Sequence, residues 1–150
     1  MLAWITPKRM LLPHWTISPT NPNSIAQAAS VEALNGDQSI IDTMKAEYVK
    51  RRDYMVERIN SIDGLSCKKP NGAFYIFMNV KDVLGKEHYG KMINTASELC
   101  DDILDRALVA MVPSEGFGID GYVRLSYATS MEVITAGLDR IEQYLKGECK

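Results

Sequence analysis

Residues that bind metals or form disulfides are scarce in this chain. The 150 residues contain three cysteines and two histidines. Cys67, Cys100 and Cys149 are widely separated and form no C-x-x-C pair, and His14 and His88 are also isolated. The sequence therefore indicates neither a disulfide framework nor a metal site. Free thiols of this kind are typical of reducing compartments, so we expect a cytoplasmic protein.

An excess of basic charge and a long apolar run are also missing. Seventeen basic residues stand against 19 acidic ones, a net charge of −2, and the basic residues form no long cluster, which disfavours a nucleic-acid partner. Met1–Trp15 is moderately apolar, but Lys8 and Arg9 interrupt it and it is too short to span a bilayer. We expect no membrane partner. The sequence also lacks a glycine-rich phosphate loop, a nucleophile elbow and an H-E-x-x-H motif.

The length and overall composition of the chain are typical of one globular domain. A chain of 150 residues can bury a proper core, and its 46% hydrophobic and 24% charged residues are typical of soluble domains. Four prolines at positions 7, 13, 19 and 22 prevent the first 22 residues from forming one helix. We expect residues 1–19 to be an irregular lead-in and residues 20–150 to be the folded domain.

Hydrophobic periodicity and turn residues predict four helices and four strands. The helices are expected at Ser24–Leu34, Gln38–Asn60, Tyr89–Arg106 and Ser130–Lys146, and the strands at Leu65–Lys69, Ala73–Val80, Leu108–Val112 and Tyr122–Tyr127. The order α-α-β-β-α-β-β-α predicts a single α/β sandwich, with a small sheet of about four strands and helices packed on it.

Local details make this prediction specific. Asn71-Gly72 predicts a tight turn between the first two strands. The second of these strands is apolar on both faces, so we expect it to be central or covered on both sides. Thr129 and Glu132 have capping-box spacing at the start of the last helix.

Three aspartates, Asp101, Asp102 and Asp105, are predicted to form a solvated helix face. They are not expected to act as a catalytic pair, because neighbouring helix positions diverge.

The strand Tyr122–Tyr127 carries the most informative charge in the chain. Because side chains alternate along a strand, Val123, Leu125 and Tyr127 point one way and Tyr122, Arg124 and Ser126 the other. If the first set faces the helices, Arg124 stands in mid-strand on the opposite face. A mid-strand arginine is costly to bury unless it meets an anion, and its planar fork suits a carboxylate or phosphate. A structural salt bridge to Asp or Glu is the competing interpretation.

The loop before this strand is a second candidate. Pro113 to Gly118 contains Gly116 and Gly118, which permit tight backbone and close approach of a ligand, and Phe117, which can cover an apolar group. An ordinary strand connection with one anchoring aromatic residue explains the loop equally well. On its own the loop decides nothing.

Four ordered segments together resemble a known family. They are Asn21–Gln27, Pro70-x-Gly72-Ala73-Phe74-Tyr75, Val112-Pro113-x-x-x-Phe117-Gly118 and Arg124-Leu125-Ser126-Tyr127-Ala128. In order and spacing they resemble the class I aminotransferases among the fold-type I pyridoxal-phosphate enzymes, and most of all the bacterial aspartate aminotransferase branch. The likeness runs from about Thr20 to Leu145 and corresponds to the C-terminal small domain of those enzymes.

The resemblance implies roles for individual residues. Arg124 matches the arginine that binds the substrate α-carboxylate, and Phe117 and Gly118 match a loop that lies near the substrate. Phe74 and Tyr75 match a strand whose aromatic residues mostly pack the small domain. One departure is Ser114, which stands where family members usually carry glycine after the proline.

The resemblance also implies what this region does not contribute. In the family, the lysine that binds pyridoxal phosphate covalently, the acid at the pyridine nitrogen and the phosphate cradle all come from the large domain, which precedes this region. No lysine here has the family's serine-rich context. We therefore expect no catalytic and no cofactor-binding residue in this chain, no bound pyridoxal phosphate and no transamination by the chain alone. Without its neighbouring domain the chain should expose apolar surface, so we expect a homodimer or a larger assembly.

Three functional interpretations follow. The first is the C-terminal domain of an aspartate-type aminotransferase, which moves an amino group between an amino acid and a 2-oxo acid. The second is a non-catalytic module derived from such an enzyme that binds carboxylates or protein partners. The third is a structural domain in which Arg124 forms a salt bridge.

Overall fold

The computed structural model describes residues 22–149, and the chain divides into two units between Ile41 and Asp42. In the first unit, helix α2 (Ser24–Asn35) matches the predicted first helix, and all its side chains are exposed. Asn23 caps it, because its side-chain oxygen accepts a hydrogen bond from the Ile25 N–H at 2.8 Å. The expected lead-in, residues 1–19, lies outside the described residues.

The second unit is built on a four-stranded antiparallel sheet. The strands β1 (Ser66–Cys67), β2 (Tyr75–Asn79), β6 (Tyr122–Ser126) and β5 (Val112–Pro113) follow each other in that order across the sheet. In the central pair, Ile76 lies opposite Leu125 and Phe77 lies opposite Arg124. The two central strands therefore fix which residues of each strand share a face.

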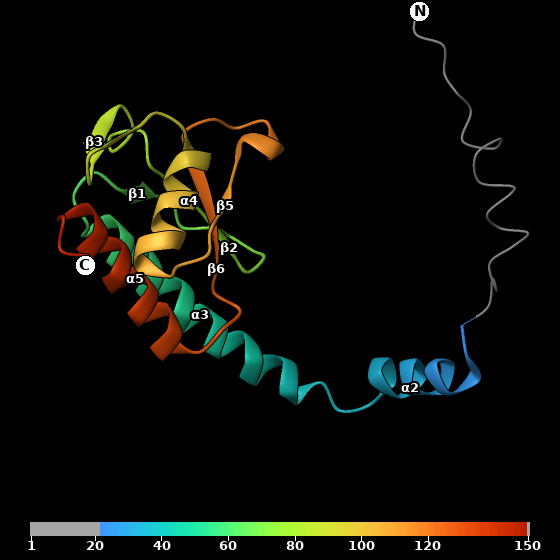
Figure 1. Ribbon diagram of the computed structural model, residues 1–150. Coiled ribbons are helices and arrows are strands. Elements are labelled where there is room, and N and C mark those ends of the chain that lie inside the picture. Colours follow the sequence, from blue (N-terminus) through green and yellow to red (C-terminus); the bar gives the residue numbers. More distant parts are fainter. Residues whose placement is uncertain (1–21, 150) are drawn as a thin grey trace, which may run out of the picture. The chain divides into compact units, whose positions relative to one another are not determined.

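Three helices cover one face of this sheet. They are α3 (Ser39–Asn60), nearly all of which belongs to this unit, α4 (Ala96–Ala107) and α5 (Met131–Leu145) (Figure 1). Their buried residues, including Ile59, Ile103 and Leu138, join Ile76 and Val123 of the sheet in a single core. This two-layer arrangement is the predicted α/β sandwich with about four strands, and the alternation predicted for β6 is confirmed.

Charged side chains also tie α3 to α5. The Arg58 guanidinium donates to Asp139 at 2.8 Å and to Glu142, and Lys146 lies 2.7 Å from the other Glu142 oxygen. Hydrogen bonds from Lys146 and then Arg58 lower the pKa of Glu142 to about 2.

The predicted third helix begins too early. Residues Lys86–His88 and Lys91–Ile93 instead form a small hairpin, β3–β4, and α4 starts only at Ala96. The turn of the hairpin needs left-handed backbone at Tyr89 (φ 50°) and Gly90 (φ 80°), which a helix cannot contain. A capping box formed by Thr95 and Glu98 fixes the start of α4.

The sheet also differs from the prediction in its details. Strands β1 and β2 do pair, but residues 68–74 lie between them, so Asn71-Gly72 is not a two-residue hairpin turn. The predicted strand Leu108–Val112 is wrong over most of its length, because Leu108 ends α4 in left-handed backbone (φ 55°) and β5 is only Val112–Pro113.

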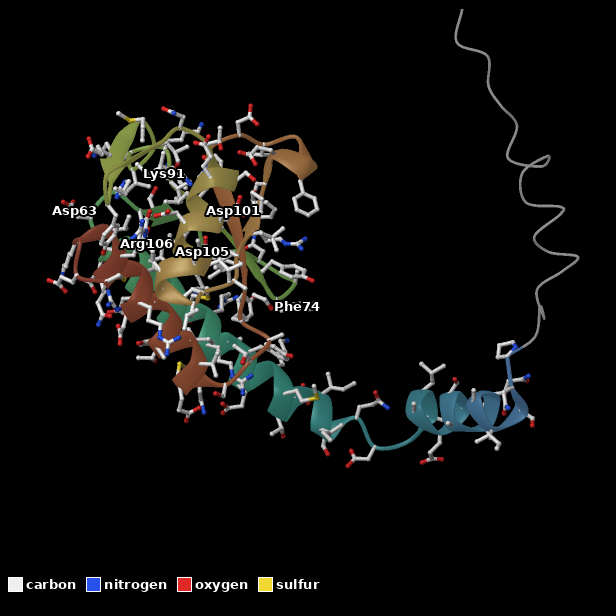
Figure 2. All side chains as sticks on the ribbon, in the orientation of Figure 1. Asp63, Phe74, Lys91, Asp101, Asp105 and Arg106 are labelled. Carbon is white, nitrogen blue, oxygen red and sulfur yellow. The ribbon has the colours of Figure 1, made fainter. Side chains whose placement is uncertain are left out.

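Two predictions about the helices are wrong as well. Ser130, not Thr129, caps α5, because its hydroxyl accepts a hydrogen bond from the Val133 N–H. Asp101 and Asp105 are exposed as expected and are labelled in Figure 2, but Asp102 is only 6% exposed. Its carboxylate accepts hydrogen bonds from the Tyr144 hydroxyl at 2.6 Å and the Arg106 Nε at 3.1 Å, which compensate its burial.

Candidate functional site

The face of the sheet that the helices leave open carries the candidate site. The second strand, β2, is central as predicted, but only Ile76 and Met78 face the core. Tyr75 and Phe77 point to the other face, where Phe77 remains 38% exposed. The prediction that this strand is central or covered on both sides is therefore met by its central position, while the described chain covers only one of its faces. Phe74, just before β2, is 43% exposed. Figure 2 labels it on the opposite side of the sheet from Asp63.

Arg124 is the charged residue at the centre of this open face. Its guanidinium carbon, Cζ, lies 4.5 Å from the centroid of the Tyr75 ring and 4.5 Å from the centroid of the Phe117 ring. Tyr75 comes from the neighbouring strand β2, and Phe117 from the short 3-10 turn η1 (Glu115–Phe117) in the loop before β6. Two aromatic contacts hold the guanidinium in place while leaving its N–H groups free to donate.

No acidic side chain within residues 22–149 forms an ion pair with Arg124. The hypothesis of a structural salt bridge therefore finds no partner in the described part of the chain. The half-buried guanidinium retains a planar set of donors that fits a carboxylate in bidentate contact.

The loop places Phe117 beside Arg124, and Gly118 follows in the same turn. Phe117 forms the contact described above, and Gly118 ends the turn with left-handed backbone (φ 77°), its N–H donating to the Glu115 carbonyl at 2.9 Å. That backbone favours glycine. Ser114 is fully buried, and its Oγ has no hydrogen-bond partner in the described structure.

Sequence reasoning missed the contributions of Tyr75 and Glu115. The family resemblance implies a packing role for Tyr75, although two-residue alternation along β2 places it on the face opposite Ile76. Glu115 accepts hydrogen bonds from the first turn of α4, a tertiary contact for which the sequence holds no local signal.

A groove of about 500 Å³ extends the open face toward β1. Tyr75, Phe77 and Tyr122 form its aromatic floor, and Lys68 and Lys69 line it on the β1 side. Lys69 already lies 2.9 Å from an Asp53 carboxylate oxygen, so of these two lysines only Lys68 has no acidic partner within residues 22–149.

Cys67 and Cys100 have thiols with raised pKa values. Burial raises the pKa of Cys67, and burial together with the charge of Asp101 raises the pKa of Cys100 to about 12, so both thiols stay protonated near neutral pH.

Residues 22–149 contain no group of three or more His, Cys, Asp or Glu side chains arranged to hold a metal ion. Nor does this part of the chain include a helix both long and apolar enough to cross a bilayer.

Residues 13–141 match the profile of the family described as aminotransferase class I and II. Among matching curated proteins, the aspartate aminotransferase of Rhizobium meliloti is 46% identical over 121 residues, which are 80% of this chain and 30% of that protein. The aspartate/prephenate aminotransferase of Nitrosomonas europaea is 39% identical over 130 residues, 85% of this chain and 33% of that protein. The chain thus spans about a third of the length of these curated relatives.

Solved structures show the same similarity in three dimensions. The crystal structure of the Rhizobium meliloti aspartate aminotransferase matches with a TM-score of 0.85 at 40% identity, over 95% of this chain and 36% of that one. The alanine aminotransferase from Pyrococcus furiosus matches with a TM-score of 0.74 at 32% identity, over 83% of this chain and 30% of that one.

Proposed function

The chain belongs to the class I and II aminotransferase family, and on that premise we propose that residues 20–150 act as the C-terminal small domain of an aspartate-type aminotransferase. Such an enzyme transfers an amino group between an amino acid and a 2-oxo acid. The contribution of this domain is Arg124, which binds the α-carboxylate of either substrate. The reducing setting inferred from the free cysteines supports a cytoplasmic location.

The single observation that carries this proposal is that Arg124 has no acidic partner among the described residues. The guanidinium stands on the open face between two elements that supply aromatic rings, and no described carboxylate neutralises it. Because a half-buried arginine without a counter-ion is unfavourable, the arrangement favours an external anion. Both substrates of an aminotransferase carry a carboxylate, so one arginine can serve both halves of the reaction.

Phe117 and Gly118 support the same site. The Phe117 ring limits the motion of the guanidinium, and we propose that it also covers the apolar part of a bound substrate. Gly118 permits the tight turn that brings the ring to Arg124. These residues bind and orient substrate and take no part in bond breaking.

The family uses pyridoxal phosphate, but the described lysines do not fit it. A lysine that binds this cofactor needs a desolvated site that favours its neutral amine. The described lysines are exposed to solvent; they are Lys45, Lys50, Lys68, Lys69, Lys81, Lys86, Lys91 and Lys146. We therefore propose that the 150-residue chain alone neither binds the cofactor firmly nor transaminates.

A chimeric enzyme tests the proposed function. The part of this chain that matches the Rhizobium meliloti aspartate aminotransferase would replace the corresponding part of that protein. We expect the chimera to transfer the amino group of aspartate to a 2-oxo acid, and the 150-residue chain to show no turnover. The measurements are amino-transfer rates and borohydride trapping of pyridoxal phosphate.

Two results would contradict the proposal. A folded, cofactor-loaded chimera without turnover would favour the alternative, a non-catalytic carboxylate-binding module. One stoichiometric lysine adduct, together with amino-donor turnover, in the chain alone would show that it is active without the large domain.

Exposed apolar side chains also support self-association. Several lie on the open sheet face and its loop, including Phe74, Phe77 and Phe117, all at least 38% exposed. Because contiguous exposed apolar surface promotes association, we propose that the isolated chain forms a homodimer or a larger assembly. Light scattering across a concentration series should show the mass rising above that of one chain; a constant monomer mass would exclude the proposal.

A further inference from the structure

The side chain of Glu115 joins the loop beneath the candidate site to helix α4. Its Oε1 accepts hydrogen bonds from the backbone N–H groups of Ala96 at 3.1 Å and Ser97 at 3.3 Å. These amides belong to the first helical turn, which has no acceptors within the helix and carries partial positive charge. Since Thr95 and Glu98 already form a local cap, Glu115 adds a separate bond from another part of the chain.

The turn has two anchors, the bond from Glu115 to α4 and the fully buried Ser114, whose N–H donates to the Tyr122 carbonyl at 3.1 Å. Residues 116–120 are exposed. Glu115 has the one polar side chain among residues 115–119, and that side chain hydrogen-bonds to α4. Backbone bonds close the turn on itself: the Phe117 N–H and the Ile119 N–H both donate to the Ser114 carbonyl.

Phe117 depends on this anchoring for its position. Its ring is 51% exposed and therefore gains little from burial, yet it lies 4.5 Å from the Arg124 Cζ. Glu115 stands two residues earlier, in the same 3-10 turn, and its backbone carbonyl also accepts from the Gly118 N–H. The bond to α4 fixes Glu115. Because Glu115 and Phe117 belong to the same short turn, the bond also restricts where the Phe117 ring can lie.

We propose that Glu115 is a positioning residue for the carboxylate site. By binding the N-terminus of α4, it holds Phe117 against Arg124 and so keeps the free edge of the guanidinium in one orientation. The proposal rests on the proposed function, since it assumes that Arg124 binds a carboxylate. Glu115 itself touches neither the guanidinium nor the ligand.

The test uses nuclear magnetic resonance of the 150-residue chain, with succinate as the carboxylate probe. An aromatic ring over the guanidinium shifts the Arg124 Cδ protons upfield, and Phe117→Leu defines the shift without that ring. In Glu115→Ala we expect these protons to move toward the Phe117→Leu position, and the succinate dissociation constant to rise by about two- to fivefold. Glu115→Gln keeps a side-chain oxygen acceptor and should preserve both values near those of the unmodified chain.

Glu98→Ala is the matched control. It removes the carboxylate half of the capping box and leaves the Thr95 hydroxyl in place, so it lowers thermal stability as a structural defect does. It leaves the bond between Glu115 and α4 in place, and the Arg124 proton shifts should stay unchanged. The proposal is overturned if Glu115→Ala leaves those shifts unchanged, or if Glu98→Ala moves them equally.

Two further observations keep the test decisive. Should Glu115→Ala not fold, the unmodified chain must still show the upfield shift and a nuclear Overhauser contact between the Glu115 Cγ protons and the Ala96 amide; the absence of either overturns the proposal. If succinate binds equally well to Arg124→Gln, the proposed function fails, while the proton shifts still decide the role of Glu115.

Discussion

Replacing Arg124 with glutamine is expected to abolish measurable succinate binding by the 150-residue chain. The unmodified site offers one guanidinium on an open face, so we expect a dissociation constant on the order of 10 mM. A hydrogen bond to a charged group contributes about 1.5–3 kcal/mol, so its loss weakens binding roughly 10- to 150-fold. Glutamine has a similar reach but neither the charge nor the five donors of arginine. The measurement is the dissociation constant from succinate titration at fixed ionic strength.

Two further variants separate geometry from charge. Arg124→Lys keeps the positive charge but loses the planar fork, so its affinity should lie between those of arginine and glutamine. Arg140→Gln removes the same charge from an exposed position on α5 and should bind succinate like the unmodified chain. Equal weakening by Arg140→Gln and Arg124→Gln would show that succinate responds to net charge and not to the proposed site.

The largest expected effect on stability comes from Ile59→Ala in α3. Ile59 is completely buried and belongs to the core formed by the sheet and three helices. Truncating such a side chain removes apolar contacts and leaves a cavity, which costs about 2–5 kcal/mol. Because small domains are stable by only about 5–15 kcal/mol, much of the stability should be lost. The measurement is the free energy of unfolding from urea titration.

Leu104→Ala is the control for this prediction. Leu104 lies on α4 and is 46% exposed, so its truncation should change the free energy of unfolding by only about 0.5 kcal/mol. If the two variants lost equal stability, α3 would not be part of the core, and the placement of β6 and Arg124 relative to the helices would need revision.

Periodicity predicted the framework of the domain well. Alternation along β6 correctly separated Val123 and Leu125, which are buried, from Arg124, which faces away from the helices. Such patterns are visible in a sequence because each residue of a regular element has a fixed direction. The same reasoning failed at residues 89–93, where the predicted helix overlaps a short hairpin whose turn depends on the backbone of Tyr89 and Gly90.

The candidate site was only partly predictable, because its contacts are tertiary. The sequence and the family resemblance singled out Arg124, Phe117 and Gly118, which the structure brings together. Tyr75 joins them only because β2 pairs with β6 in a particular register. The contact of Glu115 with α4 likewise depends on how the loop and the helix pack, which no local pattern records.

The two apolar faces of β2 have different surroundings in the structure. The strand is central, as its pattern predicts, and the described chain covers the side of Ile76 and Met78 but leaves the other side open. The aromatic surface left on the other side is the kind that another domain or subunit covers. This supports the proposal that the chain works as part of a longer enzyme, about three times its length.

The most direct test of the central claim is the Nε–H resonance of Arg124 during a succinate titration. Binding of the carboxylate to the guanidinium should move this proton downfield in a saturable manner, because a charge-assisted hydrogen bond replaces water at the donor. The same resonance should respond much less to chloride at equal ionic strength. If succinate leaves the Arg124 Nε–H unmoved while other residues respond, Arg124 is not the carboxylate-binding residue.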